Sequence, residues 1–154
     1  SGRPAIHVHD DSNRHLLEPH QETNQYAKDF LLLWSPLWDT NENTGGLTVY
    51  KNSHKFGYFK HSLKTKKKVW TPDYTHVRPG IYKKFKKMNL KIKAGSAVLI
   101  LSSLIHCGYP NKKKGSVRIV ITERYNPLKA MPYLQNQNAP MKIPYEENYN
   151  IIRD

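Results

Sequence analysis

The chain of 154 residues is 38% hydrophobic and 11% aromatic, which is enough for the core of one domain and argues against wholesale disorder. Its single cysteine, Cys107, excludes an intrachain disulfide and a thiolate metal cluster, and the longest apolar runs are too short to cross a membrane. The formal net charge of +13 favours anionic partners. We therefore expect a single domain over residues 1–154, located in the cytoplasm.

Short strand-like segments recur from the N-terminus onwards, with turn-forming residues between them. Their apolar alternation and their β-branched and aromatic residues predict strands at residues 5–9, 29–34, 47–51, 88–92, 97–101 and 117–124. Clusters rich in Gly, Pro, Asn and Thr separate these segments, and no long stretch has a helical period. Many short strands with such turns are typical of an all-β sandwich or jelly roll.

Two segments depart from this alternation. Residues 56–87 are rich in lysine and aromatic residues, which predicts a long lysine-rich loop that leaves the sheet and covers a site. After residue 124, prolines stand among polar residues, which predicts an extended C-terminal tail on the surface. The chain shows no internal repeat.

The positive charge is concentrated in residues 64–68, 83–87 and 112–114, where every basic residue is a lysine. A lysine offers a hydrated point charge, whereas an arginine offers a planar fork for bidentate contacts with bases and phosphates. Nucleic acid is therefore the less favoured anionic partner. A solvated, lysine-rich surface explains most of this charge.

The pattern with the clearest chemistry begins at His20 and Glu22, which are two residues apart. In a strand such residues share one face, so the imidazole and the carboxylate can converge on one ion. This pair alone is a weak signal, but His106 follows a later apolar strand and Arg118 lies inside the strand after that. Two imidazoles and one carboxylate can hold one face of a ferrous ion and leave the other face open for a co-substrate and dioxygen.

The surrounding segments extend this pattern. They are, in chain order, His20-Gln21-Glu22, Trp34-Ser35-Pro36-Leu37, Glu42-Asn43-Thr44-Gly45-Gly46-Leu47, Lys51-Asn52-Ser53-His54-Lys55, Gly95-Ser96, His106, Pro110-Asn111 and Arg118. From about Ile6 to Tyr125 this series resembles the phytanoyl-CoA dioxygenase family of iron(II)- and 2-oxoglutarate-dependent oxygenases. The resemblance implies a double-stranded β-helix, which is the cupin-like form of the jelly roll.

The resemblance also implies roles for individual residues and an activity. The expected Fe(II) ligands are His20, Glu22 and His106. Arg118 would pair with the distal carboxylate of 2-oxoglutarate through parallel charge-assisted hydrogen bonds, and Trp34 and Gln21 would bind the co-substrate as well. The implied reaction is hydroxylation of a C–H bond of a small organic substrate by dioxygen, and the lysines suggest that this substrate is anionic.

Two departures from the family pattern bear on these expectations. Glu22 replaces the usual aspartate, which adds one methylene but keeps an oxygen ligand, and a retained carboxylate favours hydroxylation over halogenation. The chain also begins almost at the core of the family's fold. We therefore expect it to lack the usual N-terminal extension, as a fragment or as a minimal member.

Other histidines offer competing interpretations. His7 and His9 also form a pair at strand spacing, but they precede Trp34 by too many residues to match the family, so we expect His20, Glu22 and His106 to be the ligands. His7 and His9 could still line the pocket. His54 and His61 are expected to be structural or surface residues. Packing roles are expected for the remaining cysteine and tryptophans, Cys107, Trp38 and Trp70.

Two other functions fit parts of the same pattern. A degenerate, non-catalytic jelly roll could bind polyanions through its basic loops, in which case binding would fall steeply as salt rises. A cupin-like protein could use the same ligands with another divalent metal for hydrolysis or isomerisation. Arg118 favours the oxygenase, because a clamp for a distal carboxylate has no obvious use without the keto acid. The sequence leaves the oligomeric state open.

Overall fold

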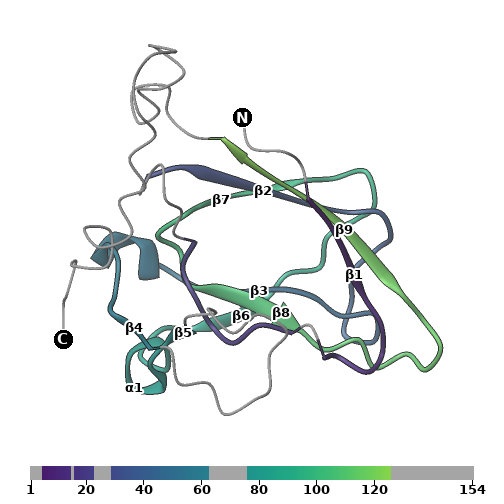
Figure 1. Cartoon of the computed structure of the whole chain (residues 1–154), viewed down its shortest axis with the longest axis horizontal. Coiled ribbons are helices and arrows are strands. Elements are labelled where there is room, and N and C mark those ends of the chain that lie inside the picture. The colour runs from purple at the N-terminus through teal and green to yellow at the C-terminus, as the bar shows by residue number, and fades with distance from the viewer. Residues whose placement is uncertain (1–4, 15, 23–28, 63–75, 126–154) are drawn as a thin grey trace, which may run out of the picture.

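The computed structural model describes residues 5–14, 16–22, 29–62 and 76–125. Within these ranges the regular structure is almost entirely antiparallel strands, which form two larger sheets that face each other (Figure 1) and a small sheet of two strands. The predicted all-β jelly-roll architecture is confirmed. In the same part of the chain, no helix is long and apolar enough to cross a membrane.

The larger sheet has four strands in the spatial order β1-β9-β2-β7. Their bounds are Ala5–His9 for β1, Arg118–Tyr125 for β9, Leu31–Pro36 for β2 and Val98–Leu101 for β7. Burial alternates along β9, because Arg118, Val120 and Thr122 are buried while the residues between them are only partly buried. One face of this sheet therefore points into the molecule and carries both apolar and charged side chains.

The smaller sheet has three strands in the order β6-β3-β8. Their bounds are Lys87–Asn89 for β6, Gly46–Tyr50 for β3 and His106–Tyr109 for β8. Trp34 and Val120 of the larger sheet pack with Leu47 of β3 and with Ile92 in a buried cluster between the sheets. A second buried cluster, which includes Ile105, lies beside β8 and packs against α1.

The predicted strands match this framework with small shifts at their ends, and two features differ. The strand β8 was not predicted, because His-Cys-Gly-Tyr has no apolar alternation. Residues 20–22 were expected in a strand, but only His20 makes a bridge, and it pairs in antiparallel fashion with His106. This bridge gives the local pairing of a strand without a full ladder.

The segment expected to be one long loop contains short regular elements. These are β4 (His61–Ser62), β5 (His76–Val77) and α1 (Pro79–Tyr82), and the 3-10 helix η1 (Ser53–Phe56) ends where the segment begins. Residues 63–75, which include Trp70, and residues 126–154 lie outside the described parts of the chain. The covering role of the loop, the extended tail and the single-domain organisation therefore stay predictions.

The sequence predicts packing roles for both Trp38 and Cys107. Trp38 is 51% exposed, so its expected place in the core or pocket wall is wrong. It follows the end of β2, where the chain leaves the sheet. Cys107 is buried beside Tyr50 and Ile105, as expected for a small buried residue.

Ile105→Ala tests the second cluster, because the Ile105 side chain is fully buried at 0% exposure. We expect the free energy of unfolding to fall by about 2–5 kcal/mol, since the removed methylenes leave a cavity. The matched control is Leu99→Ala, at a side chain 59% exposed on β7, which should change that free energy by less than about 0.5 kcal/mol. Urea unfolding followed by circular dichroism measures both, and equal losses would contradict the assigned core.

Candidate functional site

The site is organised by one backbone pairing between two distant segments. The His20 N–H donates to the His106 carbonyl oxygen at 2.9 Å, and the His106 N–H donates to the His20 carbonyl oxygen at 2.9 Å. Because directly paired residues in an antiparallel bridge project to the same side, the two imidazoles lie together, with ring centroids 4.5 Å apart. Both side chains are buried.

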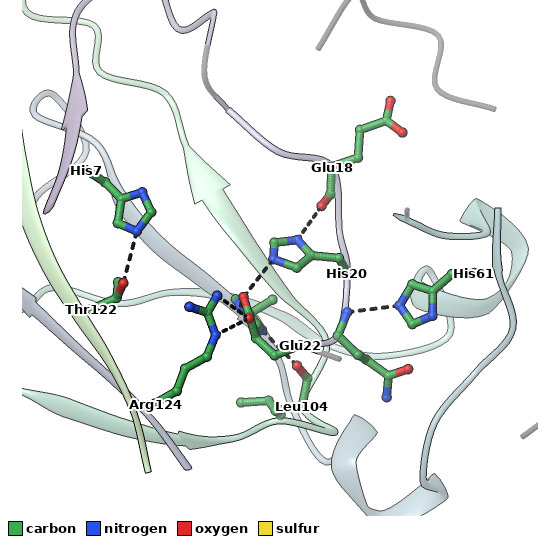
Figure 2. Close-up of polar contacts among 10 residues, drawn as sticks. His7, Glu18, His20, Glu22, His61, Leu104, Thr122 and Arg124 are labelled. Atoms are coloured by element: carbon green, nitrogen blue, oxygen red, sulfur yellow. Dashed lines mark hydrogen bonds and ion pairs between the residues drawn. The ribbon is translucent and has the colours of Figure 1, made fainter. Parts of the chain in front are cut away.

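Each imidazole is oriented by a backbone carbonyl two residues earlier. The Nδ1 atom of His20 donates to the Glu18 carbonyl oxygen at 2.8 Å (Figure 2), and Nδ1 of His106 donates to the Leu104 carbonyl oxygen at 2.9 Å. Since a carbonyl can only accept, Nδ1 carries a proton in both rings, and Nε2 is the atom whose lone pair a neutral ring offers to a metal. Burial, reinforced by the neighbouring His106, lowers the pKa of His20 and so favours the neutral ring that binds metals.

Glu22 completes the cluster from the same segment as His20. Its backbone N–H donates to the Ser102 carbonyl oxygen at 2.9 Å, and its Oε1 atom lies 3.5 Å from Nε2 of His20 and 3.6 Å from Nε2 of His106. Burial alone would raise the pKa of Glu22, but the contacts with His106 and His20 and the charge of Arg124 hold that pKa well below its usual value. The carboxylate is therefore ionised at neutral pH.

The three side chains have the donor set of a divalent metal site. One ligand atom from each of His20, Glu22 and His106 lies within 4.8 Å of the others. Two imidazoles and one carboxylate bring nitrogen and oxygen ligand atoms to one point, so a metal cation is the partner that suits them. The backbone carbonyls behind the rings fix the ligand tautomers, as is usual for metal-bound histidines. The residues present therefore fit Fe(II).

A fourth residue, Arg124 of β9, contacts the cluster directly. Its Nε and Nη2 atoms both donate to Oε2 of Glu22, at 3.1 and 2.7 Å (Figure 2). Sequence reasoning missed this contact. The available signal was the even spacing from Arg118 along one strand, which places both arginines on the same face of the sheet.

Arg118 lies deeper between the sheets and is only 3% exposed. Its Nη1 atom donates to the Tyr109 carbonyl oxygen at 3.3 Å and to the Gly46 carbonyl oxygen at 3.5 Å, whereas its Nε atom is buried without a hydrogen-bond partner among the described residues. Burial lowers the pKa of Arg118 to about 10, so the guanidinium stays charged at neutral pH. A Cβ atom at Gly45 would lie 2.6 Å from Nη1, so only glycine leaves room for this side chain.

These groups open into one cavity of about 390 Å³. The ligand cluster, Arg118 and the buried Trp34 all line it, and apolar walls come from Leu16, Leu32 and Leu47. His7, His9 and Arg14 line the cavity as well. His7 is further held by a hydrogen bond of 2.9 Å between its Nε2 atom and Oγ1 of Thr122. The volume is in the range that small ligands occupy.

The Gln21 side chain, which was expected to bind the co-substrate, contacts backbone groups instead. Its amide nitrogen donates to the Gly57 and Ser103 carbonyl oxygens at 2.8 and 2.6 Å, and its Oε1 atom accepts from the Phe59 N–H at 2.8 Å. Its side chain is engaged by backbone groups away from the cavity, because the residue between two inward-facing neighbours points the other way. Gln21 thus anchors the segment that carries His20 and Glu22.

His61 supports the same segment from behind. Its Nε2 atom accepts a hydrogen bond from the Gln21 N–H at 3.2 Å, which requires a neutral ring (Figure 2). Burial, with the nearby His20 and His76, lowers the pKa of His61 to about 4. This contact agrees with the structural role expected for His61.

A family model described as phytanoyl-CoA dioxygenase (PhyH) matches residues 1–120 of the chain. None of the curated protein sequences compared with the chain matches it. Among solved structures, the chain is similar to the non-heme alpha ketoglutarate dependent carbocyclase SnoK from nogalamycin biosynthesis, with 18% identity and a TM-score of 0.59 over 79% of this chain and 47% of that chain.

Two further solved structures give the same picture. One is the epimerase SnoN in complex with Fe3+, alpha ketoglutarate and nogalamycin RO, with 17% identity and a TM-score of 0.55 over 99% of this chain and 61% of that chain. The other is EvdO2 from Micromonospora carbonacea var. aurantiaca complexed with 2-oxoglutarate. It has 14% identity and a TM-score of 0.56 over 80% of this chain and 53% of that chain. These similarities show the shared fold, and the chain spans about half the length of these proteins.

His61→Gln tests the buried neutral imidazole behind the ligand segment. Between about pH 6.5, where an unfolded histidine titrates, and about pH 4, the unfolded state binds more protons than the folded state, so acidification destabilises the fold. The variant removes this proton uptake. We therefore expect its unfolding free energy to fall less steeply over that window, by up to about 1.4 kcal/mol per pH unit. Metal-free urea unfolding at several pH values measures the slope, and an unchanged slope would contradict the assignment.

Proposed function

Because the chain belongs to the phytanoyl-CoA dioxygenase family, we propose that it is an Fe(II)- and 2-oxoglutarate-dependent dioxygenase that hydroxylates a C–H bond of a small organic substrate. The observation that carries this proposal is the convergence of His20, Glu22 and His106 in one cavity. Two imidazole nitrogens and one carboxylate oxygen are the ligand set of non-haem iron oxygenases. The buried cation Arg118 in the same cavity supports a keto acid as co-substrate.

In this proposal Nε2 of His20, Nε2 of His106 and Oε1 of Glu22 would hold the iron. Bound iron, 2-oxoglutarate and dioxygen together supply the oxidant that converts C–H into C–OH. The protein's part is to orient the imidazoles through the carbonyls of Glu18 and Leu104, to favour the neutral form of His20 by burial, and to keep the carboxylate ionised.

Arg118 is proposed to bind the distal carboxylate of 2-oxoglutarate. Its charge is buried, and no ion pair to it is present in the described part of the chain. A buried cation is costly unless an anion is close by, so an incoming carboxylate would relieve that cost. Trp34 contributes an apolar wall to the same cavity, which would help to exclude water from the bound co-substrate.

We propose an anionic substrate from the remaining cavity walls. Arg14, His7 and His9 also line the cavity, with His9 paired directly opposite Arg118, and Glu22 is the one acidic residue among the described lining residues. Because Glu22 is engaged by Arg124 and by the proposed metal, the wall offers positive and hydrogen-bonding groups to a ligand. A cavity lined by one sign of charge concentrates ligands of the opposite sign.

Anaerobic titration with Fe(II) and 2-oxoglutarate tests the proposed function. We expect the wild type to develop the weak visible charge-transfer band of the chelate, and His106→Ala to abolish it because one ligand is lost. Arg118→Ala should weaken 2-oxoglutarate binding at least about tenfold, since a charge-assisted contact contributes about 1.5–3 kcal/mol.

The control for this titration is Arg78→Ala, which removes the same charge from an exposed position outside the cavity. It should titrate like the wild type. A folded wild type that shows no band would contradict the oxygenase assignment. If the wild type instead bound polyanions with a steep salt dependence, the assignment would change to a non-catalytic jelly roll that binds polyanions.

Matched pairs of small carboxylic acids and their methyl esters test the charge of the substrate. Each pair differs by one negative charge at nearly constant shape. We expect substrate-stimulated succinate formation, measured with 2-oxoglutarate in excess, to be confined to the acids or to favour them at least about tenfold. Preference for the esters would contradict the anionic class and leave the oxygenase assignment intact.

A further inference from the structure

Glu22 uses its two carboxylate oxygens for different purposes. Oε1 is nearly equidistant from the two imidazole Nε2 atoms, at 3.5 and 3.6 Å, whereas Oε2 receives both hydrogen bonds from Arg124. The Glu22 side chain is 14% exposed and that of Arg124 is 37% exposed, so the contact lies at the edge of the cavity, partly shielded from water. A pair shielded in this way keeps more of its strength than a surface ion pair.

We propose that Arg124 is a positioning residue that holds Oε2 aside, so that Glu22 offers only Oε1 to the metal. This inference rests on the proposed function. A glutamate has three rotatable side-chain bonds, so an unanchored carboxylate samples many orientations and can approach a metal with both oxygens. Two donors on one oxygen remove that freedom. Glu22 would then occupy only one coordination position of the metal, and its Oε2 atom would leave a second position open.

The sheet gives β9 two arginines with separate roles. Arg118 and Arg124 lie six residues apart on one strand, so their side chains share the inward face. Arg118 donates to backbone carbonyls of the smaller sheet, while Arg124 lies opposite Leu32 of β2 and reaches the metal-ligand carboxylate. Figure 2 shows Arg124 directed toward Glu22. Within the described residues, the anion clamp and the ligand anchor are thus different side chains of one strand.

The sign of the effect on metal binding separates positioning from simple charge. Removing a positive charge close to a cation site should, by Coulomb's law alone, tighten metal binding. Loss of an anchor behind a metal ligand typically weakens it by about 10–100-fold. Weakened binding in a folded variant therefore reports positioning.

The experiment is an anaerobic titration with Co(II), followed by its visible ligand-field bands, of the wild type, Arg124→Met and Arg124→Lys. Methionine keeps an unbranched chain without donors, and lysine keeps the charge and one donor group. The exposed Arg78→Met is the matched control. We expect Arg124→Met to weaken Co(II) binding about 10–100-fold with altered bands, Arg124→Lys to recover part of that loss, and the control to match the wild type.

The melting temperature of each metal-free variant shows whether it is folded. Unchanged or tighter Co(II) binding by either folded Arg124 variant, with bands like those of the wild type, would overturn the positioning role while leaving the proposed function standing. A folded wild type that binds no Co(II) would overturn both. If Arg124→Met does not fold, Arg124→Lys decides alone, since it should still bind more weakly than the wild type.

Discussion

The antiparallel bridge between His20 and His106 is the constraint on which the site depends. Two backbone hydrogen bonds of 2.9 Å join segments far apart in the sequence and bring the two imidazoles to one side. Each ring then uses the carbonyl two residues earlier to fix its tautomer. The next inward position after His20 is Glu22, whose N–H continues the pairing at the Ser102 carbonyl. One short stretch of backbone pairing thus positions all three proposed ligands.

The charges around this bridge are arranged so that the site is incomplete without ligands. Arg118 is a buried cation with no carboxylate partner in the described ranges, and Glu22 brings a largely buried carboxylate to the two imidazoles, with its Oε2 atom contacted by Arg124 at the cavity edge. Both conditions cost folding free energy. A metal and an anionic co-substrate would each relieve one of them, so the binding free energy of these ligands should also stabilise the fold.

Sequence reasoning predicted the parts of this structure that alternation controls. Residues 5–9 form β1 with the expected bounds, and β9 is shifted by a single residue at each end. Sequence reasoning did not predict β8, because glycine and histidine interrupt the apolar pattern there. It also misassigned Gln21, because the role of this residue depends on which face of the chain meets the cavity. The contact of Arg124 with Glu22 joins residues 102 positions apart, so no local pattern encodes it.

The most direct test of the central claim is anomalous diffraction from crystals of the protein grown anaerobically with Mn(II) as a substitute for Fe(II) and with 2-oxoglutarate. The account predicts one strong anomalous peak within bonding distance of Nε2 of His20, Oε1 of Glu22 and Nε2 of His106, with the distal carboxylate of the keto acid at Arg118. A peak between His7 and His9 instead, or an intact cluster that binds no metal at saturating Mn(II), would contradict it.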